Sequence, residues 1–196
     1  RVGVEFAELF EDRQLSNDCK AAEKKLVKAA SKVYKKFLAS CPAPDAPGSK
    51  QVAALMTITG LIDAPKADKE FLSINGAQGF STFYGYYMLE AMAMAGNYQG
   101  ALDVIREYWG AMIDLGATSF WEDFDINWIP NATPIDELVP EGKKDIHGDC
   151  GAYCYVGFRH SLCHGWASGP TSWLSRHILG VEVTWMSSST YNSSFR

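Results

Sequence analysis

Three carboxylates lie among aromatic side chains in the segment GATSFWEDFDINW, residues 116–128. Burying a carboxylate that has no partner costs free energy, so Glu122, Asp123 and Asp125 need a reason to stand beside Trp121. One interpretation is structural: the segment caps a helix or anchors a loop, and its acids form a solvated rim. The other is a site for a ligand that has both polar groups and an apolar face, in which Glu122 is the candidate general acid or base.

A second segment, residues 159–180, reads RHSLCHGWASGPTSWLSRHILG and combines histidines with tryptophan and small residues. His160 and His164 are four residues apart, so on a helix they share a face. A zinc site is one alternative, but no paired CxxC supports it. His164 is also a candidate hydrogen-bond donor to a polar ligand, against the alternative of a satisfied core histidine. The small residues beside Trp166 leave room for a ligand or for close helix packing. The cysteines nearby are Cys150, Cys154 and Cys163.

Composition narrows the class of protein. The chain has 196 residues, 47% of them hydrophobic and 21% charged, which favours one packed domain or a piece of a larger one. The net charge of −5 argues against binding to nucleic acid or to an anionic membrane. No apolar run reaches the length of a membrane span. The sequence also lacks a phosphate loop and a nucleophile elbow, and five cysteines cannot form a complete disulfide framework.

Hydrophobic periodicity predicts a succession of helices. Apolar, aromatic helices alternate with amphipathic ones, as in two concentric layers with inner helices buried on both sides. We therefore expect an all-α architecture built from helical hairpins, with an ordinary bundle as the alternative. Connectors are expected at 41–50 and 63–72, and an irregular segment at 128–151. The expected helices are 15–40, 51–62, 77–95, 98–115, and a last one that begins at Ser161 or Thr171 and ends at Leu179.

Two stretches, residues 79–125 and 159–180, resemble bacterial α-L-rhamnosidases of glycoside hydrolase family 78. The resemblance runs from Gln51 to Val181, more weakly over the loop 130–148, and is carried by the motifs GATxFWE and SLCHGWASGP. It implies an (α/α)6 toroid, of which this chain holds the C-terminal half. Residues 1–185 then form a partial catalytic domain, and residues 186–196 a polar tail.

The resemblance also implies an activity and a site. Family members hydrolyse terminal α-L-rhamnosyl residues from plant or microbial polysaccharides and glycosides, with inversion and without a cofactor or metal. Two acids flank the bond, far enough apart to admit a water. Glu122 matches the general base, His164 matches a histidine that contacts the sugar, and Trp121 and Trp166 are expected to line the pocket.

Asp123 and Asp125 stand outside the family's motif, and we expect them to tune Glu122 or to bind sugar hydroxyls. The general acid has no counterpart in residues 5–20, and no β-sandwich follows Trp185. The expected partners are therefore a rhamnose-containing oligosaccharide or glycoside and the remainder of a longer protein, with an N-terminal half-toroid and β-sandwich domains. Half a toroid would expose inner helices such as 80–95 to solvent.

Two further expectations follow from the resemblance. The chain alone, as an excerpt or a cleavage product, is expected to hydrolyse nothing, and the protein is expected in the periplasm or outside the cell. The alternative function is a catalytically inactive, carbohydrate-binding fragment of a helical toroid, which the missing general acid favours.

Overall fold

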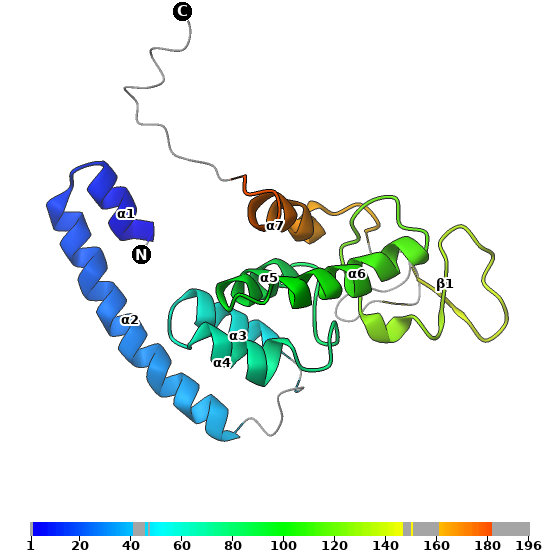
Figure 1. Cartoon of the computed structure of the whole chain (residues 1–196), viewed down its shortest axis with the longest axis horizontal. Helices are drawn as coiled ribbons and strands as arrows, with labels where there is room; N and C mark the ends of the chain where they lie inside the picture. Colours follow the sequence, from blue (N-terminus) through cyan, green and yellow to red (C-terminus); the bar gives the residue numbers. More distant parts are fainter. Residues whose placement is uncertain (1, 41–45, 47, 147–149, 151–160, 182–196) are drawn as a thin grey trace, which may run out of the picture.

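The computed structural model describes residues 2–40, 46, 48–146, 150 and 161–181. This part of the chain is mostly helical, so the predicted all-α class is confirmed (Figure 1). None of its helices combines the length and the apolarity needed to cross a bilayer. The α-helices are α1 (Val2–Leu9), α2 (Arg13–Ser40), α3 (Ser49–Ile58), α4 (Ala64–Ala67), α5 (Gly85–Met94), α6 (Tyr98–Asp114) and α7 (Gly169–His177). A π-helical turn, η1 (Asp68–Leu72), and two 3-10 turns, η2 (Ile126–Trp128) and η3 (Gly165–Ala167), complete the helical elements.

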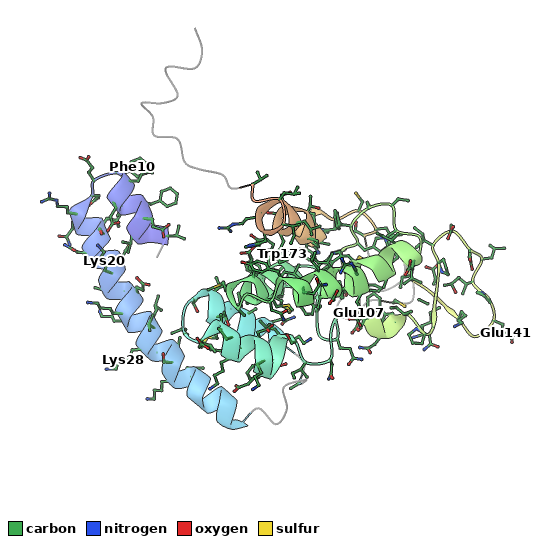
Figure 2. All side chains as sticks on the ribbon, viewed as in Figure 1. Phe10, Lys20, Lys28, Glu107, Glu141 and Trp173 are labelled. Atoms are coloured by element: carbon green, nitrogen blue, oxygen red, sulfur yellow. The ribbon has the colours of Figure 1, made fainter. Side chains whose placement is uncertain are left out.

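Helices α1 and α2 form an N-terminal hairpin that packs mainly on itself (Figures 1 and 2). Lys20 Nζ and Glu8 Oε1, which are 2.8 Å apart, join the two helices. Asp12 Oδ1 accepts a hydrogen bond from the Leu15 N–H at 2.9 Å and so satisfies a donor in the first turn of α2. This helix was predicted correctly, except that it begins two residues earlier than expected, at Arg13.

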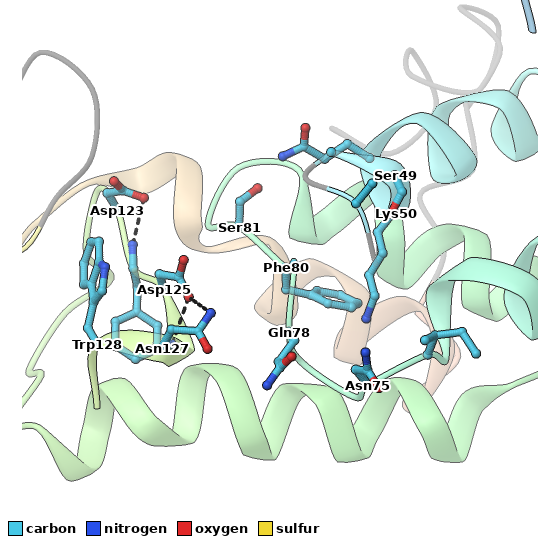
Figure 3. A pocket seen from close by; sticks show the side chains of 16 residues that line it. Ser49, Lys50, Asn75, Gln78, Phe80, Ser81, Asp123, Asp125, Asn127 and Trp128 are labelled. Carbon is cyan, nitrogen blue, oxygen red and sulfur yellow. Dashed lines mark hydrogen bonds between the residues drawn. The ribbon is translucent and has the colours of Figure 1, made fainter. Parts of the chain in front are cut away.

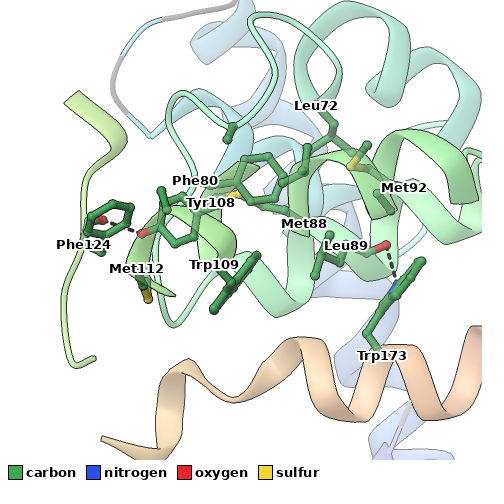
Figure 4. Packing of buried hydrophobic residues seen from close by; sticks show 14 of the residues in the cluster. Leu72, Phe80, Met88, Leu89, Met92, Tyr108, Trp109, Met112, Phe124 and Trp173 are labelled. Atoms are coloured by element: carbon green, nitrogen blue, oxygen red, sulfur yellow. Dashed lines mark hydrogen bonds between the residues drawn. The ribbon is translucent and has the colours of Figure 1, made fainter. Parts of the chain in front are cut away.

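Helix α5 is the centre of the remaining fold. It contacts α3, α4, α6 and α7, and its side chains Met88, Leu89 and Met92 are buried among them (Figure 4). Trp173 on α7 is fully buried, and its Nε1 donates to the Leu89 carbonyl oxygen at 3.0 Å. The indole therefore packs its apolar surface in the core while its N–H is hydrogen-bonded, and both interactions hold α7 against α5.

The expected exposure of the helix in 80–95 is not what the structure shows. Met88, Leu89 and Met92 are buried, whereas three tyrosines are partly exposed and Phe83 and Met94 are exposed. The expectation of an apolar face open to solvent is therefore wrong for the side of the helix that α3 and α7 cover.

The start of α5 also differs from the prediction. The helix expected from residue 77 begins only at Gly85, and residues 73–84 form turns instead. Gly76 and Gly79 have φ of 54° and 78°, a left-handed conformation that a continuous α-helix does not allow. Likewise α3 ends at Ile58 rather than residue 62, with Gly60 at φ 76°.

The segment 63–72, expected as a connector, holds α4 and η1 instead. Asp63 caps α4, since its Oδ1 accepts from the Lys66 N–H at 3.1 Å, and Pro65 lies in the first turn, where it has no hydrogen bond to lose. At the other end of the chain, α7 begins at Gly169, which excludes the expected start at Ser161 and falls two residues before Thr171.

The irregular segment predicted over 128–151 is confirmed for its described residues, with one addition. Two short strands, β1 (Ala132–Thr133) and β2 (Lys144–Asp145), pair in parallel, Ala132 opposite Lys144. The buried Ile146 follows β2 and joins the core. Ile146 therefore anchors the C-terminal end of the segment 128–146 to the helical body.

Candidate functional site

The two segments singled out in the sequence lie side by side. The Glu122 N–H donates to the Ser161 carbonyl at 2.8 Å, and the His164 N–H donates to the Phe120 carbonyl at 2.7 Å. These two bonds join the backbone of residues 120–122 to that of residues 161–164. Ser119 Oγ also donates to the Leu162 carbonyl. The fold thus brings the FWE and SLCHGW motifs together.

Glu122 is held by hydrogen bonds at both its side chain and its backbone. Its Oε2 accepts from the Ser161 N–H at 2.9 Å. Its carbonyl oxygen accepts from Thr82 Oγ1 and from Trp166 Nε1, each at 2.6 Å. The residue is half-buried, so the carboxylate is oriented by the fold while part of it remains accessible.

An aromatic group lies next to Glu122. The His164 and Trp166 rings are 4.1 Å apart between centroids and tilted by 31°, and Trp166 lies 5.8 Å from Phe83. Trp166 is 42% exposed and Phe83 40% exposed, so both rings present apolar surface to solvent. Flat exposed rings beside a fixed carboxylate suit a ligand with an apolar face and hydroxyl groups.

Trp121 occupies a different environment from the one expected. Its side chain is fully buried, and its ring lies 6.0 Å from that of Phe124 in the core. An indole without exposed surface cannot line a pocket for a ligand, so the expected pocket role of Trp121 does not fit this structure. Trp121 instead anchors the segment that carries Glu122 to the hydrophobic core.

Asp123 and Asp125 line a separate cleft of about 320 Å³, and Glu122 is not among the residues that line it (Figure 3). Asp123 Oδ1 accepts from the Phe124 N–H at 3.0 Å. Asp125 Oδ1 accepts from the N–H and from Nδ2 of Asn127, at 2.9 and 2.8 Å, and so opens η2. Glu122 and Asp123 are neighbours in the chain, but only Asp123 lines this cleft.

Lys50 lines the same cleft and was not predicted from the sequence. Only 3% of the residue is exposed. Its Nζ donates to the Gly76 carbonyl at 2.6 Å and lies 5.0 Å from the centroid of the Phe80 ring. Burial lowers the pKa of Lys50 to about 8, and the Glu107 carboxylate opposes this shift by favouring the charged form. Its position directly before the apolar helix expected at 51–62 is the signal that could have identified it.

Glu107 on α6 holds the same loop from the other side. Its Oε2 accepts from the Ala77 N–H at 3.0 Å, and it lies so close to Gly76 that a side chain there would need it to move. Lys50 and Glu107 together thus fix the loop 74–79 that forms one wall of the cleft.

The zinc alternative falls partly outside the described residues, since His160 and Cys154 lie there. Among the residues that the structure does describe, no group of three histidine, cysteine or acidic side chains is arranged to hold a metal ion. Cys150 and Cys163 are not in a disulfide with any described cysteine.

Comparison with known proteins gives no relative. No family model, no curated protein and no solved structure matches the chain.

Proposed function

We propose that this chain is part of the catalytic domain of an inverting glycosidase that hydrolyses terminal α-L-rhamnosyl residues. The observation that supports the proposal is the meeting of two motifs distant in sequence. Glu122 and His164 come together through backbone pairing, and the Trp166 indole donates to the Glu122 carbonyl. The half-buried Glu122 lies beside the exposed ring of Trp166, and this neighbourhood supports a site for a ligand with hydroxyl groups and an apolar face.

In this proposal Glu122 acts as general base. The Ser161 N–H orients its carboxylate, which removes a proton from a water molecule as that water attacks the anomeric carbon. His164 and Trp166 contact the sugar ring from the adjacent surface. The general acid of an inverting pair lies about 6.5–9.5 Å from the base, and we propose that residues outside this chain supply it.

The helical arrangement supports the matching fold proposal. Helix α5 is buried between α3, α6 and α7, as an inner helix of a double layer would be. We propose that residues 1–185 belong to the C-terminal half of an (α/α)6 toroid. An N-terminal half-toroid and β-sandwich domains would then complete the protein, which would work in the periplasm or outside the cell.

Replacing Glu122 in a natural protein that contains this chain tests the activity. Glu122→Gln keeps the hydrogen bond from Ser161 but cannot accept a proton, so hydrolysis of an aryl α-L-rhamnoside should fall by about 10²–10⁴-fold. Binding of L-rhamnose should be retained, because the side chain keeps its size.

Asp114→Asn is the matched control, since this carboxylate is exposed at the end of α6 and lies outside both the Glu122 surface and the cleft. Its turnover should stay near that of the wild type. Wild-type turnover by Glu122→Gln would overturn the proposed role of Glu122.

A second candidate function is carbohydrate binding without catalysis. The contacts of Glu122 favour this second function. Its carboxylate and its backbone N–H both bond to the Ser161 backbone, and holding two backbone segments together is a structural role. If the complete protein binds L-rhamnose through Trp166 but releases no sugar from aryl rhamnosides, this second function replaces the first.

A further inference from the structure

The charge of the chain is divided unevenly between helix α2 and the rest. Helix α2 holds eight of the chain's 18 basic residues and two of its 23 acidic residues, a net charge of +6. The rest of the chain therefore carries −11, since the whole chain carries −5. At physiological salt, charges more than about 8 Å apart are largely screened from each other. The acidic net charge of the chain therefore does not describe the surface of this helix.

One face of α2 is an exposed apolar stripe. Its members recur at intervals that return to the same face of a helix with 3.6 residues per turn. Helix α1 leaves them exposed, and the longest of them, Leu26, is 70% exposed. A contiguous apolar surface of this kind indicates an interaction site. The apolar stripe consists of Leu15, Ala22, Leu26, Ala29 and Val33.

Lysines border this stripe. Lys25 and Lys32 directly precede Leu26 and Val33, and successive residues of a helix are separated by about 100° around its axis. Both lysines are exposed, and neither is paired with a carboxylate in the described part of the chain. Lysine side chains at such a border can lay their methylene groups along the apolar surface while the ammonium group stays in water. Further lysines, such as Lys28, continue round the helix (Figure 2).

The surface of a bilayer matches both features of α2. A helix with an apolar face and a lysine-rich polar face lies in the plane of the membrane surface, with its apolar face in the boundary between headgroups and acyl chains. The 28 residues of α2 give it a length of about 42 Å along such a surface. A nucleic acid would pair with the lysines but would leave the apolar stripe in water. The two features together therefore favour lipid as the partner.

We propose that α2 binds the surface of a membrane that contains anionic phospholipids. Its apolar stripe enters the interface, and Lys25 and Lys32 lie among the headgroups. The acidic remainder of the chain is repelled by the same surface, so the hairpin faces the lipid and the body faces water. The inference does not depend on the proposed glycosidase activity, because the contacts of Glu122 come from outside the hairpin.

The test is cosedimentation of the purified chain with vesicles of phosphatidylcholine, either alone or mixed with phosphatidylglycerol. The chain should bind the mixed vesicles and bind the neutral vesicles at least about tenfold more weakly, because the lysines then lack anionic partners. Binding to the mixed vesicles should weaken as the salt concentration rises.

A pair of double variants tests the position of the charges. Lys25→Gln combined with Lys32→Gln should weaken binding to the mixed vesicles by about 30-fold. Glutamine retains the helix propensity of lysine, and far-ultraviolet circular dichroism checks that α2 persists. Lys66→Gln combined with Lys69→Gln is the matched control, since these exposed lysines on α4 and η1 change the net charge equally. This control should bind as the wild type does.

A third variant tests the apolar stripe. Leu26→Ala removes an exposed apolar side chain without changing the charge, and it should weaken binding to the mixed vesicles by about tenfold. Absence of binding to the mixed vesicles overturns the proposal, as does equal weakening by the two lysine pairs or unchanged binding by Leu26→Ala. A dimer in solution that Leu26→Ala dissociates, without vesicle binding by the wild type, also overturns it and identifies a second copy as the partner.

Discussion

Glu122 and Asp123 are neighbours in the chain, yet their side chains serve different surfaces. The carboxylate of Glu122 bonds to the Ser161 backbone, whereas Asp123 lines the cleft with Lys50. The acids could be identified from the sequence, but the surface that each one faces could not. That surface depends on the backbone hydrogen bonds between residues 120–122 and 161–164, which are distant in sequence. Trp121 shows the same limit, since its neighbours suggested a pocket wall and its indole lies in the core.

Lys50 provides a test of burial at the residue scale. Its pKa is about 8 in the folded protein and 10.5 ordinarily, so between these values the unfolded state binds more protons than the folded state. The free energy of unfolding gains a contribution that rises with pH through this window and is absent below about pH 8.

Lys50→Met removes the titrating group. Urea titrations from pH 7 to 10.5 measure the free energy of unfolding of the wild type and of the variant. The wild-type value minus the variant value should rise with pH. A difference independent of pH would show that the folded protein does not desolvate Lys50.

At the scale of elements, two glycines differ in the space around them. Gly85 lies in a tight contact between helices, and Gly110 lies where a side chain has room. A Cβ at Gly85, the first residue of α5, would lie 2.7 Å from Cη2 of Trp109 on the neighbouring α6. Gly85→Ala should therefore destabilise the protein by about 1–3 kcal/mol through overpacking.

Gly110→Ala is the matched control within α6, because its added Cβ would have no described atom within 4 Å apart from its own stretch of helix. It should stabilise the protein by about 0.5–1 kcal/mol, since glycine loses more chain entropy in a helix than alanine. Thermal unfolding of both variants measures the contrast, and equal effects would mean that α5 and α6 do not pack as described.

The elements were predictable to different degrees. Helix α6 was predicted within one residue, because its amphipathic period is complete and Asn97 and Gly116 mark its ends. Helix α4 and η1 were missed, since Pro65 and the charges around it read as a connector. The start of α5 was misplaced because apolar residues continue through the turns that Gly76 and Gly79 allow.

At the scale of the whole molecule, the described residues form the N-terminal hairpin and the helical body around α5. Helix α2 packs mainly on α1, and apolar side chains such as Phe10 and Leu26 are largely exposed there (Figure 2). The core cluster, by contrast, contains residues from α3 to α7 and none from the hairpin.

Deleting residues 1–45 should therefore leave the body folded. Its melting temperature should change by less than about 4 °C, the shift expected for a stability change near 1 kcal/mol. Circular dichroism in the near ultraviolet measures the packing of the body's aromatic side chains. Loss of that signal after the deletion would mean that the hairpin is part of the cooperative unit.

The central claim is that Glu122 activates the water in an inverting hydrolysis, and chemical rescue tests it most directly. Glu122→Ala, in the natural protein that contains this chain, should lose turnover because no carboxylate remains to accept the proton. Azide needs no deprotonation and should enter the vacated space and attack the anomeric carbon. Cleavage of an aryl α-L-rhamnoside should therefore be restored, with β-L-rhamnosyl azide as the product seen by NMR. Full activity of the variant without azide, or an α-configured azide product, would contradict it.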